Sequence, residues 1–157
     1  MKVIDNFLPE YNFKQLHSIV MSSEFDWFYN DEVCTGDKLH QYTHTVYSGY
    51  DDRKSIYFPC FEYCLNSLRV RQLYRVKLNS RPASLFRRSS RYHIDFKDMK
   101  TAIFYMNTNN GYTKFKKGGK VKSVANRIVI FDSNSEHAGV TCTNKKRRVV
   151  VNINYRE

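Results

Sequence analysis

TAIFYMNTNNGYTKF, residues 101–115, sets two short apolar segments on either side of an Asn-Asn-Gly turn, and this arrangement decides the fold. The same pattern of short segments and turn-forming residues runs through the whole second half of the chain. The other segments are VRQLYRVKLN (70–79), YHIDF (92–96), KVKSV (120–124), RIVIFDS (127–133), AGVTCT (138–143) and RVVVNINY (148–155). Many short strands at regular spacing are typical of a β-sandwich or barrel.

The first half of the chain mixes strands with two helices. We expect a strand over residues 3–8, a helix from Glu10 to about Ser22, a strand over residues 40–48 and a helix over residues 54–68. The prediction is an α+β fold in one domain spanning residues 1–157. Its core would be a double-stranded β-helix (jelly roll), with the N-terminal helices packed on one sheet.

Composition excludes several classes of protein without naming a function. The 157 residues include 12 Tyr and 11 Phe, which is too aromatic for a disordered chain. The formal net charge of +11 makes a nucleic-acid partner one option. However, the basic residues form only short clusters, and a solvated basic surface explains them equally well.

The four cysteines, Cys34, Cys60, Cys64 and Cys142, form no CxxC pair, so we expect free thiols in a reducing compartment. Residues 1–13 lack an apolar signal core, and no segment has the length of a membrane span. These observations favour a cytoplasmic protein.

His93 and Asp95 stand two residues apart on an expected strand, and alternation would point both side chains to one face. His137 follows the apolar segment RIVIFDS. Two His and one carboxylate form the facial triad of non-haem Fe(II) oxygenases. The alternative is an ordinary hydrogen-bonded His–Asp pair, with His137 capping a loop.

The last expected strand supplies a second signal. Val149, Val151 and Ile153 share one face, and Arg148 shares the other face with Asn152 and Asn154. An arginine inside a barrel needs an anionic partner, and a carboxylate can take a bidentate pair with its guanidinium group. If the register slipped by one residue, Arg147 would take the place of Arg148.

Taken together, VIDNFLP, YHIDF, GYTKF, EHAG and RRVVVNINY resemble the Fe(II)/2-oxoglutarate oxygenase superfamily, and above all small phage-type prolyl-4-hydroxylase-like enzymes. The resemblance covers nearly the whole chain. It implies that His93, Asp95 and His137 bind Fe(II). It also implies that Arg148 pairs with the distal carboxylate of 2-oxoglutarate and that the Tyr105 hydroxyl also reaches this carboxylate. Asn79 matches a position that makes a polar contact to the co-substrate or the substrate.

The resemblance further implies a reaction of 2-oxoglutarate with O2 that releases succinate and CO2 and hydroxylates a substrate. We expect a protein or peptide side chain as that substrate, with proline as one candidate, in the host cytoplasm if a phage encodes the chain. Prolyl 4-hydroxylases usually carry Lys where this chain has Arg148, which leaves the preference for proline open. Relatives that dealkylate nucleic acids carry a second Arg later on the same strand. This chain has Ile153, Asn154 and Tyr155 in that region instead.

Three other functions compete with a peptide hydroxylase. A nucleic-acid or nucleotide oxygenase has only the net charge in its favour. A non-catalytic jelly-roll module would not need Arg148 inside the barrel. A zinc hydrolase could use the three metal ligands but would also leave Arg148 unexplained.

Overall fold

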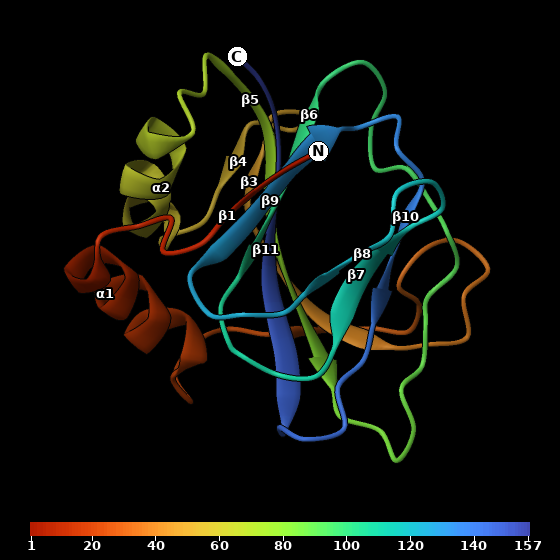
Figure 1. Cartoon of the computed structure of the whole chain (residues 1–157). Helices are drawn as coiled ribbons and strands as arrows, with labels where there is room; N and C mark the ends of the chain where they lie inside the picture. The colour runs from red at the N-terminus through yellow and green to blue at the C-terminus, as the bar shows by residue number, and fades with distance from the viewer.

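A large antiparallel sheet forms the centre of the computed structural model, which describes residues 1–157 (Figure 1). Its strand order is β1-β9-β6-β11-β5-β3-β2, and β4 pairs with β3 at the side. The strands are β1 (Lys2–Ile4), β2 (Phe28–Asn30), β3 (Gln41–Ser48), β4 (Arg53–Lys54), β5 (Gln72–Pro82), β6 (Lys100–Tyr105), β9 (Arg127–Asp132) and β11 (Arg147–Arg156). Strand β11 lies between β5 and β6, so the residues expected to bind a co-substrate sit in the middle of the sheet.

A smaller sheet with the order β10-β7-β8 completes the jelly roll. It consists of β7 (Tyr112–Phe115), β8 (Lys120–Lys122) and β10 (His137–Val140). Apolar side chains from both sheets share one cluster: Ile103, Tyr105, Phe115, Val121, Val129, Phe131 and Val150. The two sheets therefore pack against each other through alternate residues of their strands. The expected jelly-roll core is confirmed.

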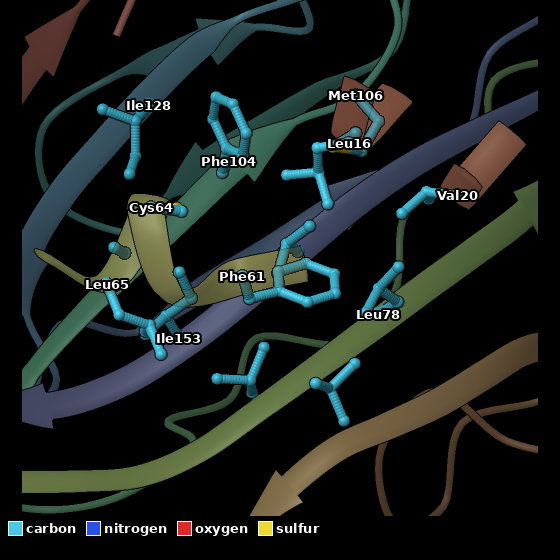
Figure 2. Close-up of a cluster of buried hydrophobic side chains, with 14 of the residues drawn as sticks. Leu16, Val20, Phe61, Cys64, Leu65, Leu78, Phe104, Met106, Ile128 and Ile153 are labelled. Carbon is cyan, nitrogen blue, oxygen red and sulfur yellow. The ribbon is translucent and has the colours of Figure 1, made fainter. Parts of the chain in front are cut away.

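The other face of the large sheet contacts the helices α1 (Glu10–Met21) and α2 (Glu62–Ser67), with a 3-10 turn at Phe58–Phe61 before α2 (Figure 1). Figure 2 shows Leu16 and Val20 of α1 and Phe61 and Cys64 of the second helical segment in the same cluster as Ile153 of β11. Burying a large apolar side chain contributes roughly 1.5–3 kcal/mol, so this layer supplies much of the stability of the fold.

Period-two alternation in β11 explains how one strand serves two environments. Val149, Val151 and Ile153 belong to the cluster under the helices. Arg148, Val150 and Asn152 face the space between the sheets, where they line a cavity. The register expected for this strand is therefore confirmed.

Several expected elements differ from the structure. The segment 54–68 is not one helix: it begins with β4 and becomes helical only at Phe58, with Pro59 in the first turn. Residues 92–96 form no strand, since only His93 pairs, through a single bridge to His137. The first strand ends at Ile4, because Asn6 adopts a φ of 49° that breaks an extended chain. The short strand β2 was not expected.

None of the helices is both long and apolar enough to cross a lipid bilayer.

Candidate metal and co-substrate site

A cavity of about 630 Å³ lies between the two sheets and contains nearly all the residues singled out in the sequence. Strands β5 and β11 form one wall, while Thr113 of β7 and two residues of β10 border it from the smaller sheet. The loop residues Arg91 to Asp95 close it at one side. Of the predicted site residues, His93, Asp95, His137, Arg148 and Asn79 line this cavity.

His93 and His137 come together through the backbone. Each donates its N–H to the carbonyl of the other across 3.0 Å, which ties the loop before β6 to the first residue of β10. The centroids of their rings are 4.8 Å apart. A long-range bridge, rather than a regular strand, thus positions the first histidine.

Both imidazole rings are oriented by a backbone carbonyl that lies beside Nδ1. Nδ1 of His93 lies 3.1 Å from the carbonyl of Arg91, and Nδ1 of His137 lies 3.1 Å from that of Ser135. A carbonyl can only accept, so each Nδ1 carries the proton and each Nε2 keeps a free lone pair. The two Nε2 atoms face Asp95, at 3.9 Å for His93 and 3.8 Å for His137. This is the tautomer in which a histidine binds a metal through Nε2.

Asp95 is held by the large sheet. Asn152 donates to its Oδ2 across 2.6 Å, and the guanidinium of Arg75 lies 3.1 Å from its Oδ1. Arg75 is held in turn by Asn154, to whose side-chain oxygen its Nε donates across 3.1 Å. Burial raises the pKa of the Asp95 carboxyl, but Arg75, His137 and the Asn152 hydrogen bond together bring it below its ordinary value. The carboxylate is therefore ionised.

This donor set fits one divalent metal ion. The ligand atoms of His93, Asp95 and His137 all lie within 4.8 Å of one another. Burial lowers the pKa of His137, so its imidazole is neutral and can bind a cation. A 2-His-1-carboxylate set on one side of an octahedral ion leaves positions for other ligands and is characteristic of Fe(II) oxygenases.

Arg148 lines the same cavity and has no acidic partner. Only 3% of its surface is exposed. Its Nε donates to Ser123 Oγ across 2.8 Å and its Nη2 to Thr113 Oγ1 across 3.0 Å. Burial lowers the pKa of this guanidinium, yet an arginine remains charged at neutral pH. A buried cation with only neutral partners favours an anion beside it, so Arg148 could bind one.

The two other residues considered in the sequence, Tyr105 and Arg147, do not line the cavity. Tyr105 lies behind Arg148, whose guanidinium carbon is 5.5 Å from the centre of the tyrosine ring, and the Tyr105 hydroxyl donates to Thr113. Arg147 points to the helical side, over the ring of Trp27, and donates to the carbonyl of Met21.

Four further cations line the cavity and were not predicted from the sequence: Arg91, and Arg75, Lys77 and Arg81, which alternate along β5. The spacing of two residues along β5, continued by Asn79, was the available signal. The strand expected from the sequence ends at Asn79, two residues before Arg81, and therefore leaves Arg81 out.

The sequence matches no protein-family model, and no curated protein sequence matches it. Solved structures do match. A prolyl-4-hydroxylase from Pseudomonas putida aligns with 99% of this chain and 92% of its own chain, with a TM-score of 0.70 and 15% sequence identity.

Two further hydroxylases align over 99% of this chain. A prolyl hydroxylase from Trichoplax adhaerens, solved with a peptide fragment of hypoxia inducible factor, is covered over 82% of its length at a TM-score of 0.61 and 16% identity. A viral collagen prolyl hydroxylase from Paramecium Bursaria Chlorella virus-1, solved with 2-oxoglutarate, is covered over 94% at a TM-score of 0.59 and 15% identity. The chain therefore has the fold of the prolyl-4-hydroxylase-like Fe(II)/2-oxoglutarate oxygenases.

Proposed function

We propose that this chain is an Fe(II)- and 2-oxoglutarate-dependent dioxygenase that hydroxylates a side chain of a protein or peptide. The observation that carries the proposal is that one cavity contains both a three-residue metal donor set and a buried arginine without an acidic partner. A 2-oxo dicarboxylate matches this arrangement, because one end can chelate a metal while the other end pairs with a guanidinium.

Each residue has a proposed part. His93, Asp95 and His137 would hold Fe(II), and Asn152 and Arg75 would orient the Asp95 carboxylate. Arg148 would bind the distal carboxylate of 2-oxoglutarate, and Tyr105 would support Arg148 from behind. Asn79, on the wall between Lys77 and Arg81, would contact the co-substrate or the substrate. The bound iron would supply the activation of O2, with release of succinate and CO2.

The substrate proposal rests on the fold and on the position of the cavity. The similar structures include a prolyl hydroxylase bound to a peptide and a collagen prolyl hydroxylase. In this chain, the loop residues Val33, Cys34, Thr35 and Tyr92 line the same cavity as the metal donors. A peptide that binds over these loop residues would bring one side chain to the metal, and proline is the first residue to test.

The test begins without O2. Fe(II) and then 2-oxoglutarate are added anaerobically, and binding is followed by the charge-transfer absorption that chelation of a 2-oxo acid to Fe(II) produces. O2 is then admitted, and succinate is measured with and without proline-containing peptides. Stoichiometric binding of both, followed by peptide-stimulated succinate release, is the expected result. If the chain binds Zn(II) but shows no charge-transfer absorption when Fe(II) and 2-oxoglutarate are added, the proposal is refuted.

A further inference from the structure

Arg81 is a second buried arginine in the cavity, directly opposite Arg148. The two residues are cross-strand partners on β5 and β11, and each is 3% exposed. Like charges opposite each other on neighbouring strands repel, and burial prevents water from screening them. Burial and the nearby Arg148 lower the pKa of Arg81 to about 10, which still leaves it charged at neutral pH. Such a pair needs an anion.

The hydrogen bonds of Arg81 are incomplete. Its Nη1 donates to the carbonyl of Gly139 across 2.8 Å, but Nε and Nη2 are buried and have no partner in the protein. Neither Arg81 nor Arg148 takes part in an ion pair. Buried donors in proteins nearly always have an acceptor, so the unused N–H groups of Arg81 indicate a ligand.

Gly139 shows that both guanidinium groups border the same small space. A Cβ added to this glycine would lie 3.3 Å from Nη1 of Arg81 and 3.5 Å from Nη1 of Arg148. A methyl group there would occupy the gap between the two side chains. Because glycine has none, the gap is open to the two oxygens of one carboxylate.

We propose that Arg81 and Arg148 together hold a single carboxylate, the distal one of the 2-oxo dicarboxylate, as a two-arginine clamp. The inference rests on the proposed function, and it adds Arg81 and Gly139 as residues that determine which 2-oxo acid is bound. A clamp of two cations binds a 2-oxo acid with a charged far end and discriminates strongly against one that ends in a methyl group. The loss is large because two buried guanidinium groups would then remain without a partner.

The experiment compares two ligands that chelate the metal in the same way. 2-Oxoglutarate carries the distal carboxylate, and 2-oxopentanoate carries a methyl group in its place. Dissociation constants are measured anaerobically with Fe(II) for the parent protein and for Arg81→Gln, Arg148→Gln and Gly139→Ala. Arg147→Gln is the matched control, since its guanidinium lies on the other side of the same strand, over Trp27.

We expect Arg81→Gln and Arg148→Gln each to weaken 2-oxoglutarate binding about tenfold to a hundredfold, as the loss of a charged hydrogen bond does. Gly139→Ala should also weaken it, because its methyl group fills the gap. Binding of 2-oxopentanoate should not weaken in Arg81→Gln or Arg148→Gln, because its methyl end does not pair with a guanidinium group, and Arg147→Gln should bind both ligands like the parent.

The outcomes separate the clamp from the proposed function. If Arg148→Gln loses 2-oxoglutarate while Arg81→Gln retains it, the clamp is wrong and the oxygenase proposal stands. If Arg81→Gln weakens both ligands equally, Arg81 acts on the fold rather than on the carboxylate, and the clamp is again wrong. If the parent protein fails to bind 2-oxoglutarate at all, the proposed function itself fails.

Discussion

Asn152 donates a hydrogen bond of 2.6 Å to Asp95, so β11, the strand that carries Arg148, also orients the carboxylate of the candidate metal site. The two ends of the cavity are thus built from one central strand. This relationship explains the polar face of β11: Asn152 fixes Asp95, and Asn154 fixes the Arg75 side chain that pairs with it.

Replacing Asn152 should weaken metal binding without removing a ligand. Without its amide, Asp95 loses a hydrogen bond that fixes its orientation, and loss of such a partner typically costs tenfold to about a hundredfold in metal affinity. We expect this loss in Asn152→Ala, measured by anaerobic titration with Fe(II). Asn79→Ala is the control, because Asn79 lines the cavity but makes no hydrogen bond to Asp95. Equal affinities in the two variants would contradict the role of Asn152.

Removing Asp95 should abolish metal binding and turnover together. Asp95→Ala takes away the only carboxylate that lines the cavity and leaves two imidazoles. The fold should persist, since the apolar cluster under the helices does not involve Asp95. Metal content, succinate release and thermal unfolding are the measurements, with the exposed His40→Ala as control. Full oxidative activity in Asp95→Ala would refute the assignment of the triad.

Arg148 and Arg147 should differ sharply in their effect on co-substrate affinity. Removing one partner of a buried charged pair costs a few kcal/mol, so Arg148→Ala should weaken 2-oxoglutarate binding about a hundredfold or more. Arg147 lies over Trp27 on the helical side, so Arg147→Ala should leave that affinity unchanged and affect only stability. The dissociation constants are measured with Fe(II) present and O2 absent. If Arg147→Ala weakened 2-oxoglutarate binding and Arg148→Ala did not, Arg147 rather than Arg148 would face the co-substrate.

The four cysteines should all react as free thiols once the protein is denatured without reductant. All four are unpaired in the structure. In the native protein Cys64 should resist alkylation, because its burial between α2 and the large sheet raises the pKa of its thiol to about 12. The unfolded thiol ionises near its ordinary value of 9.0, so the thiolate forms first in unfolded chains. At pH 9 the labelling of Cys64 should therefore still follow the rate of unfolding. Rapid labelling in the native state, or fewer than four thiols after denaturation, would be inconsistent with this placement.

The sequence predicted the parts of the site that depend on local alternation. In RVVVNINY the apolar and polar residues alternate, and this pattern placed Arg148 correctly between the sheets. The position of His93 was correct for a different reason from the one expected: a bridge to His137, and not a strand, orients it. A pairing between residues so far apart in the chain leaves no periodic signal.

Arg81 and Arg75 show a second feature of the site that the sequence alone could not predict. Their contacts to Gly139 and Asp95 depend on how β5 is aligned with β11, on the position of β10 and on the course of the loop that carries Asp95. Local sequence indicates that a strand is present, but it does not reveal which residues face each other across the sheet.

The charges that line the cavity have a consequence for the speed of binding. Arg75, Lys77, Arg81, Arg91 and Arg148 face it, and Asp95 is the only acid among the lining residues. Such a concentration of positive charge attracts a dianion before contact and raises its association rate constant. Salt should slow this capture, because the Debye length is only about 10 Å at 0.1 M ionic strength. In stopped-flow mixing, the association rate constant of 2-oxoglutarate should fall markedly as salt increases. Its dissociation rate constant should change little, since it is set by short contacts inside the cavity.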